Sequence, residues 1–252
     1  MLEATLANIQ IVLVEPAGAL NIGSIARVMK NMGLCQLVLV NPHCDHLGDE
    51  ARQMAVHAQD VLDLAKVVGT LPEGLVGCRG AIATTARTRT LSAPLEHPRI
   101  ALLWLVELAQ QGPVALIFGP EDRGLNNIEL NYAQRFLSIP ANPAYPSLNL
   151  AQATAICCYE LYQLVSSKDP SLSDSSSFTP DIPAAFETLE AYYQQLEALL
   201  LRVGYLYPHT ADSRMQKFRR LFSRAMPSSA EVAMLRGILS QVEWALQHSK
   251  NA

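Results

Sequence analysis

Short apolar runs alternate with longer helical patterns through the first two-thirds of this 252-residue chain. The apolar runs, rich in β-branched residues, are 9–14, 37–40, 81–85, 114–118 and 136–139. Helices are expected at about 22–32, 50–64 and 98–111, and after Asn149. Strands that are apolar along their whole length and separated by helices of about ten residues or more are typical of a parallel sheet with helices on both faces. The alternation therefore predicts an α/β domain.

The composition changes sharply at Ser166. Seven of the twelve residues 166–177 are serine, so this segment has too few apolar side chains to pack and is expected to be a flexible linker. Beyond it, apolar residues three and four apart predict helices near 186–200, 215–222 and 232–246. Ser228 and Glu231 have the spacing of a capping box that would begin the last of these helices. We therefore expect an α/β domain at 1–165, a linker at 166–180 and a helical domain at 181–252.

Several classes of protein do not fit the sequence. No run of 18 or more apolar residues predicts a membrane span, and the N-terminus lacks the basic start of a signal peptide. The five cysteines form no Cys-x-x-Cys pair, which favours a reduced, cytoplasmic protein. The cluster His43-Cys44-Asp45-His46 fits no common zinc spacing, so we expect no metal site. A serine hydrolase is disfavoured because no Gly-x-Ser-x-Gly elbow occurs.

The loop after the first strand has two glycines at the spacing of a phosphate loop, in the segment 18–27. Ser24 stands where that loop needs lysine, and the Gly-x-Gly-x-x-Gly fingerprint of dinucleotide-binding folds is absent from the sequence. A turn that leads into a helix remains, and the first helical amides could bind an anion, with Arg27 on the same side. An ordinary strand-to-helix turn with a solvated arginine is the alternative.

Two further polar loops follow expected strands, where open α/β sheets bind their ligands. Thr84-Thr85-Ala86-Arg87-Thr88-Arg89 suits a phosphate or the rim of a nucleoside site, or is a polar loop at the sheet edge. In the segment 118–125, two glycines flank Glu121, Asp122 and Arg123. Glycine there lets a ligand approach the backbone closely, whereas a carboxylate that caps a helix is the simpler interpretation.

A proline-rich segment precedes the helix that follows Asn149. Three prolines in seven residues, from 140 to 146, impose an extended path with few free backbone donors. Ser147 is expected either to cap the helix or to belong to a binding loop. A rigid polar loop at this place favours a binding function.

Three of these segments together resemble the three motifs of the TrmH branch of SPOUT RNA methyltransferases. They are Asn21-x-Gly23-Ser-x-x-Arg27, Phe118-Gly119-x-Glu121-x-x-Gly124-Leu125, and Ile139-Pro140 to Ser147-Leu148-Asn149-Leu150-Ala151. The resemblance covers about 8–165. The loop at 84–89 and Arg-Gly-Ile-Leu at 236–239 are more narrowly similar to TrmJ-type enzymes, which 2′-O-methylate nucleotide 32 of the tRNA anticodon loop.

This resemblance implies a deep trefoil knot in the C-terminal part of the α/β domain, although knots are rare among protein folds. It implies an S-adenosylmethionine site in the knot, at a homodimer interface. The cofactor would contact Thr84, Thr85, Ala86, Gly119, Ile139, Ser147 and Leu148. The family's conserved polar positions match Arg27, Glu121, Ser147 and Asn149, which we expect to be the catalytic set.

The resemblance implies methyl transfer to a ribose hydroxyl. A ribose hydroxyl must attack a methyl group in line, and correct placement of two reactants alone can contribute roughly 7–11 kcal/mol. A guanidinium remains protonated in nearly every setting, so Arg27 is expected to anchor an RNA phosphate and orient the hydroxyl. Ser147 and Asn149 would hold and polarise that hydroxyl.

Three other functions remain open at this point. The chain could methylate ribosomal RNA or another tRNA position, or it could be a non-catalytic RNA-binding protein with the same knot. A general doubly wound nucleotide-binding domain is the third possibility, and the missing fingerprints disfavour it.

The net charge of −4 alone argues mildly against a nucleic-acid partner. It is, however, unevenly divided, with −5 in residues 1–180 and +1 in residues 181–252. A band without acidic residues occupies 214–224 and suggests a tRNA-binding surface, or a solvated helix face. The expected RNA contacts are Arg27, Arg87, Arg89, Arg214, Lys217, Arg219, Arg220 and Arg224.

Overall fold

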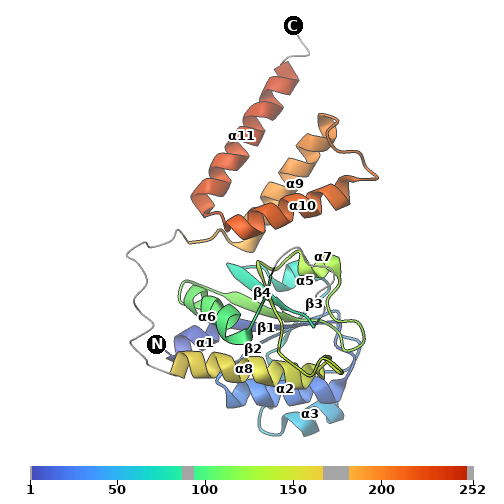
Figure 1. The fold of residues 1–252 in the computed structure, drawn as a ribbon, viewed down its shortest axis with the longest axis vertical. Coiled ribbons are helices and arrows are strands. Elements are labelled where there is room, and N and C mark those ends of the chain that lie inside the picture. Colours follow the sequence, from blue (N-terminus) through green and yellow to red (C-terminus); the bar gives the residue numbers. More distant parts are fainter. Residues whose placement is uncertain (1, 87–93, 167–181, 249–252) are drawn as a thin grey trace. The chain divides into compact units, whose positions relative to one another are not determined.

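The computed structural model describes residues 2–86, 94–166 and 182–248 (Figure 1). The chain divides into two compact units, residues 1–178 and 179–252. All but the first residue of the expected linker at 166–180 lies outside the described residues.

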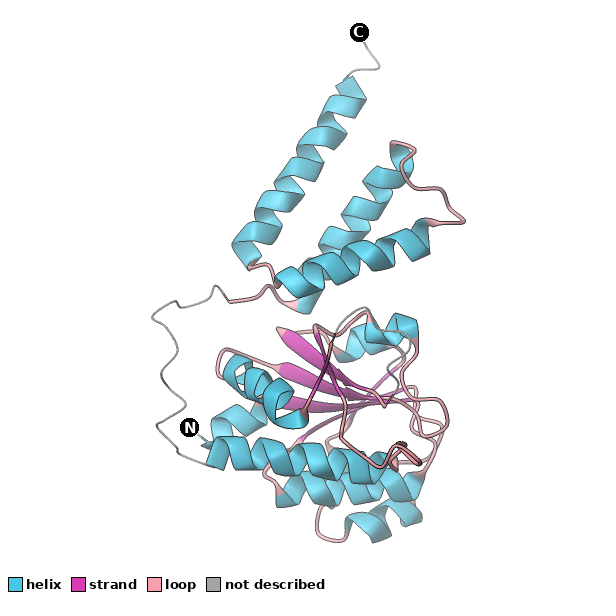
Figure 2. Cartoon of the chain, viewed as in Figure 1, coloured by secondary structure: helices cyan, strands magenta, loops and turns pink. Residues whose placement is uncertain are grey.

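The first unit contains a seven-stranded parallel sheet (Figure 2). The strands are β1 Ile9–Val14, β2 Gln36–Val40, β3 Lys66–Val68, β4 Gly80–Thr84, β5 Leu95–Glu96, β6 Val114–Phe118 and β7 Arg135–Leu137. Their order across the sheet is β3-β2-β1-β6-β4-β7-β5. The predicted α/β class is therefore confirmed. The trefoil knot stays a prediction.

Helices cover both faces of this sheet, as the fully apolar strands predicted. They are α1 Leu2–Ala7, α2 Ala19–Asn31, α3 Asp49–Ala55, α4 Gln59–Asp63, α5 Leu71–Gly74, α6 Pro98–Ala109, α7 Asn127–Leu130 and α8 Leu150–Ser166. The main core joins α1, α2, α6 and α8 to one face of the sheet, which includes Leu13, Leu39 and Phe118. The opposite face of β2 carries Val38 and Val40, against which α5 packs.

The predicted helix at 50–64 is wrong, because the chain breaks it into α3 and α4. Val56 ends α3 with a positive φ of 54°, a conformation that β-branched residues rarely adopt. Arg52 stabilises the break, since its guanidinium donates to the carbonyl oxygen of Leu47 and pairs with Asp63 of α4 at 2.6 Å. The edge strands β3 and β5 are three and two residues long, too short for a periodic pattern to predict.

The parallel arrangement brings four chain turns to one edge of the sheet. The strands β1, β6, β4 and β7 are neighbours, and their carboxyl ends point the same way. The segments that follow them begin at Glu15, Gly119, Thr85 and Ser138. The motifs singled out in the sequence are therefore neighbours in space, although about 130 residues separate the first from the last.

The second unit consists of α9 Phe186–Arg202, α10 Ala211–Ala225 and α11 Ser229–His248. They enclose a small core that includes Tyr193, Leu196, Met215 and Val232. The predicted capping box is confirmed, because the Ser228 amide donates to Glu231 at 2.7 Å and the Glu231 amide donates to the Ser228 hydroxyl at 3.3 Å. No helix among the described residues is long and apolar enough to span a membrane. All five cysteines are unbridged.

Gly23 of α2 and Gly237 of α11 differ in the space around them, and a comparison of the two tests the packing between α2 and α3. A Cβ on Gly23 of α2 would lie 2.2 Å from the carbonyl oxygen of Ala51 in α3, so this position cannot hold a side chain without displacing backbone. Gly237 of α11 has no atom within 4 Å of the same Cβ position.

We predict that Gly23→Ala lowers the free energy of unfolding by about 1–3 kcal/mol through overpacking. Gly237→Ala should raise it by about 0.5–1 kcal/mol, since alanine favours an exposed helix. Urea unfolding followed by circular dichroism measures both. The same sign for the two variants would contradict the close approach of α2 and α3.

Candidate active site

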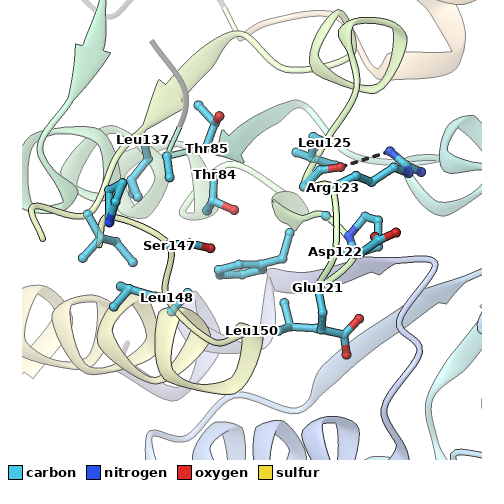
Figure 3. A pocket seen from close by; sticks show the side chains of 18 residues that line it. Thr84, Thr85, Glu121, Asp122, Arg123, Leu125, Leu137, Ser147, Leu148 and Leu150 are labelled. Atoms are coloured by element: carbon cyan, nitrogen blue, oxygen red, sulfur yellow. Dashed lines mark hydrogen bonds between the residues drawn. The ribbon is translucent and has the colours of Figure 1, made fainter. Parts of the chain in front are cut away.

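The loops after β4, β6 and β7 surround an open pocket (Figure 3). All seven residues expected to hold a cofactor line it, namely Thr84, Thr85, Ala86, Gly119, Ile139, Ser147 and Leu148. Apolar walls come from Phe118, Leu137 and Leu150. The structure thus brings together loops that the sequence analysis had singled out separately.

The loop after β4 is attached to the strands on both sides of it. The Thr84 hydroxyl donates to the carbonyl oxygen of Ile117 in β6 at 3.0 Å. The Thr85 amide donates to the carbonyl oxygen of Leu137 in β7 at 2.9 Å. These bonds fix the backbone of residues 84–86 at the pocket. The next residues, with Arg87 and Arg89, lie outside the described part of the chain, so the structure does not place these two expected RNA contacts.

The glycine after β6 is required by the path of the loop. A Cβ on Gly119 would lie 2.3 Å from the Leu125 amide nitrogen and 2.4 Å from the carbonyl carbon of Gly124. Gly124 has a φ of 67°, in the left-handed region. The segment 119–125 therefore curls back on itself, and its backbone forms one side of the pocket.

The Glu121 carboxylate binds another part of the chain rather than the helix that follows it. It accepts hydrogen bonds from the amides of Ala17 and Gly18, at 3.1 and 3.2 Å, and from Asn21 Nδ2 at 2.8 Å. The turn before α2 therefore does bind an anion through its amides, but the anion belongs to this chain. Partial burial raises the pKa of Glu121, but these hydrogen bonds outweigh it and hold the pKa below its ordinary value. The carboxylate is ionised at neutral pH.

Arg123 was not assigned a role from the sequence. Its guanidinium pairs with Glu15, at the end of β1, at 2.6 Å and with Glu129 of α7 at 2.9 Å. Glu129 also completes a capping box with Asn126. The hydrogen bond from Arg123 lowers the pKa of Glu15. Long-range pairing of this kind leaves no mark in the local spacing of residues, which is why the sequence did not show it.

The hydrogen bonds at the start of α8 identify the side chain that caps this helix. Asn149 Oδ1 accepts from the amides of Ala151 and Gln152, at 2.9 and 3.2 Å, so Ser147 is not the cap. Asn149 Nδ2 also donates to Asn21 Oδ1 at 3.1 Å. The exposed Ser147 hydroxyl points into the pocket and makes no hydrogen bond with the described residues (Figure 3). Of these two side chains, Ser147 is therefore the one available to a ligand.

Arg27 lies apart from the other expected catalytic residues. It is exposed on α2, it does not line the pocket, and it makes no hydrogen bond or ion pair with the described residues. Its sequence motif is shared with Asn21, which does reach the site through Glu121 and Asn149. Asn21 is a site residue whose role the local spacing of residues does not reveal.

The cationic band at 214–224 is divided between two faces of α10. Arg219 forms two hydrogen bonds of 2.6 Å with Glu190 of α9 and lies 4.5 Å over the Tyr193 ring. This pairing argues against the predicted RNA contact by Arg219, because its guanidinium is already held within the helical unit. Arg214, Lys217 and Arg224 are exposed. Arg220 is half-buried.

The described residues contain no group of three or more His, Cys, Asp or Glu side chains placed to hold a metal ion. The cluster at 43–46 instead forms hydrogen bonds with nearby residues and with the carbonyl oxygen of Pro16. For example, Asp45 accepts from the Leu47 amide at 2.9 Å.

Family models match both units of the chain. The SpoU rRNA Methylase family matches residues 8–159, and the tRNA methyltransferase TrmJ, C-terminal domain, matches residues 187–251. The chain is 42% identical to the tRNA (cytidine/uridine-2′-O-)-methyltransferase TrmJ of Pectobacterium atrosepticum, over 94% of this chain and 98% of that protein. It is 43% identical to the Salmonella typhimurium protein of that name, over 94% and 97%.

Solved structures are similar over nearly the whole chain. TrmJ from Z. mobilis ZM4 matches with a TM-score of 0.80 and 34% identity, over 93% of this chain and 98% of that chain. A probable methylase family protein from Haemophilus influenzae Rd KW20 matches with a TM-score of 0.60 and 34% identity, over 97% and 99%.

The lowered pKa of Glu121 gives a prediction on stability. A carboxylate with a folded pKa below its unfolded value stabilises the fold above the unfolded value, near 4.5, and loses this effect as the pH falls through the folded pKa. We expect Glu121→Gln to lower the free energy of unfolding at pH 7 by about 1 kcal/mol, a figure reduced for partial exposure. The difference from the unchanged protein should shrink as the pH falls below 4.5.

Urea unfolding between pH 7 and pH 3.5 measures this difference. Asp122→Asn is the matched control, because the Asp122 carboxylate is the next one along the chain and makes no hydrogen bond with the described residues. An equal, pH-dependent loss in both variants would show that the Glu121 contacts are not its cause.

Proposed function

Since this chain belongs to the TrmJ family within the SpoU methylases, we propose that it transfers a methyl group from S-adenosylmethionine to a ribose 2′-hydroxyl of tRNA. The target we propose is nucleotide 32 of the anticodon loop, with cytidine or uridine as its base. The family models cover both units, and the relatives named above are tRNA (cytidine/uridine-2′-O-)-methyltransferases. Methylation of ribosomal RNA or of another tRNA position is the alternative.

The observation that carries the proposal is the pocket at the carboxyl edge of the sheet. Loops that are about 35 and 20 residues apart in the chain meet there, and each contributes residues that its motif assigned to the cofactor. The backbone approach at Gly119 and the apolar side chains of Leu137 and Leu148 suit a flat, partly apolar ligand such as an adenosine.

The charge beside the pocket also suits this cofactor. S-adenosylmethionine, when bound, supplies an electrophilic methyl group on a positively charged sulfur. Glu121 lines the pocket, and its lowered pKa keeps a negative charge there at neutral pH. That charge stabilises a cationic ligand, so the residues present fit the group.

Ser147 and Asn149 have different capacities towards the ribose hydroxyl. The Ser147 hydroxyl is available both to donate and to accept. Asn149 already accepts two amides through Oδ1, so it can offer a ligand only the second proton of Nδ2. Ser147 is therefore the residue we propose to hold the hydroxyl in line, with Asn149 fixing the start of α8 beneath it.

Glu121 is better described as a positioning residue than as a catalytic one. Its three hydrogen bonds hold the turn before α2, and through Asn21 they reach Asn149. Its effect on the ribose hydroxyl therefore passes through other residues.

Arg27, a cation without a partner among the described residues, is the group we propose to bind an RNA phosphate next to the target nucleotide.

The family resemblance implies a homodimer through the knot region. In such a dimer, the second copy would complete the RNA-binding surface to which Arg27 and this pocket belong. The outer face of α8 supports an interface, since Ile156, Tyr159 and Tyr162 are exposed three residues apart. We place this activity in the cytoplasm, where tRNA is modified and thiols stay reduced.

The target position can be tested with a modified substrate. The protein is incubated with labelled S-adenosylmethionine and a tRNA transcript that carries cytidine at position 32, and nuclease mapping locates the label. We expect incorporation at nucleotide 32, and none with an otherwise identical transcript that has a 2′-deoxynucleotide there. Label retained by the deoxy transcript would contradict the position, and no label in any RNA would contradict the enzymatic function.

The role of Arg27 can be separated from cofactor binding. We predict that Arg27→Ala lowers the rate of methyl transfer at least 100-fold, because a phosphate contact that positions the hydroxyl is lost. The affinity for S-adenosylmethionine, measured by calorimetry, should change less than twofold. Lys30→Ala is the control, since Lys30 lies one turn further along α2 and pairs with Asp60 at the surface. A collapse of cofactor affinity in Arg27→Ala would overturn this role.

A further inference from the structure

The loop between α9 and α10 exposes two tyrosines on a fixed backbone. Tyr205 and Tyr207 are 54% and 55% exposed, while Leu206 between them is 1% exposed and anchors the loop in the core of the helical unit. The amides of Tyr205 and Leu206 both donate to the carbonyl oxygen of Leu200 at 3.0 Å. Gly204, with a φ of 75°, permits this sharp exit from α9. The rings are therefore presented to solvent by an ordered loop.

Each ring already has a neighbour that orients it. The Arg214 guanidinium lies 5.5 Å from the centre of the Tyr205 ring, and its Nη1 donates to the Tyr205 carbonyl oxygen at 2.9 Å. The Tyr207 ring is stacked with His209 at 6.0 Å and an interplanar angle of 26°. Thr210 donates to the Tyr207 carbonyl oxygen through its amide at 2.8 Å and through its hydroxyl at 3.2 Å.

Positive charge lies along α10, the helix that follows this loop. Arg214, Lys217 and Arg224 are exposed and spaced three and seven residues apart, so they lie on one face of the helix, whereas Arg219 is on the inner face against Glu190. Residues 202–224 contain six basic side chains and one acidic side chain, Asp212. An exposed aromatic pair at one end of a cationic helix face combines the two elements that single-stranded nucleic acid requires, stacking surface and phosphate charge.

We propose that Tyr205 and Tyr207, together with Arg214, form a stacking site for unpaired bases of RNA, with the phosphates of the same strand along Lys217 and Arg224. This inference rests on the proposed function, because it names how the helical unit would hold the tRNA substrate. A protein partner is the less favoured occupant, because the surface around the rings is cationic and its tyrosines are separate rings rather than one apolar groove.

The contributions of stacking and of charge to binding depend differently on salt, and the experiment uses this difference. The affinity of the full chain for an unmodified tRNA transcript is measured by filter binding at several salt concentrations. Loss of one stacked base lowers affinity about 5- to 150-fold. We therefore expect that loss in Tyr207→Ala, with an unchanged slope of log affinity against log salt. Tyr207→Phe should stay within about twofold of the unchanged protein. Lys217→Ala should instead reduce the slope by about 0.7–0.9.

Trp244→Ala is the matched control. Trp244 is an equally exposed aromatic residue of the same unit, 55% exposed and stacked with His248 at 4.2 Å, but it lies on α11 outside the cationic face. It should bind tRNA as the unchanged protein does. Tyr207→Trp provides a direct reading, since stacked bases should quench the fluorescence of the added tryptophan when RNA is titrated.

Two results would overturn the inference. One is that Tyr207→Ala binds tRNA with the same affinity as the unchanged protein. The other is an equal loss in Tyr207→Phe and Tyr207→Ala, which would assign the effect to the hydroxyl. Either result leaves the proposed function standing if the unchanged protein still methylates the transcript. Binding is measured without S-adenosylmethionine, so a failure of methyl transfer does not affect this experiment.

Discussion

The carboxylate of Glu121 connects segments of the chain that are about a hundred residues apart, and the geometry of the pocket depends on it. Its oxygens bind the two amides of the turn before α2 and the side chain of Asn21. Asn21 then binds Asn149, which caps α8. Without an acceptor at this place, the amides of the turn would need another partner. One ionised side chain thus fixes the loop after β6, the start of α2 and the start of α8 relative to one another.

As a consequence, several charged side chains of the catalytic unit are paired with groups of the same unit. Arg123 pairs with both Glu15 and Glu129, and the Glu121 carboxylate accepts hydrogen bonds from two amides and from Asn21. These interactions position loops and offer little to a polyanion. Affinity for RNA must then come from cations that have no partner among the described residues, such as Arg27 in this unit and Lys217 in the helical one. Positioning and binding are therefore assigned to different side chains.

The sequence predicted the parts of the fold whose signals are local and repeated. The apolar runs of β1 and β6 and the capping box of α11 were found because each depends on neighbours in the chain. Asn149 rather than Ser147 as the cap of α8, the break at Val56, and the pairing of Arg219 with Glu190 depend on contacts that spacing does not encode. The pocket was anticipated because parallel strands bring their carboxyl ends together, whereas the role of Arg123 was missed because its partner Glu15 lies 108 residues away in the chain.

The helical unit shows why a net charge is a poor guide to an RNA partner. Purely electrostatic binding weakens as the salt concentration rises, and it weakens more steeply when more phosphates are neutralised. The helix α10 offers few exposed cations for such binding, because Arg219 is paired with Glu190. Stacking on Tyr205 and Tyr207 would add affinity that salt does not remove. A chain with a net charge of −4 can then hold RNA at physiological salt, provided that exposed cations stand beside exposed aromatic rings, as Arg214 does beside Tyr205 at the start of α10.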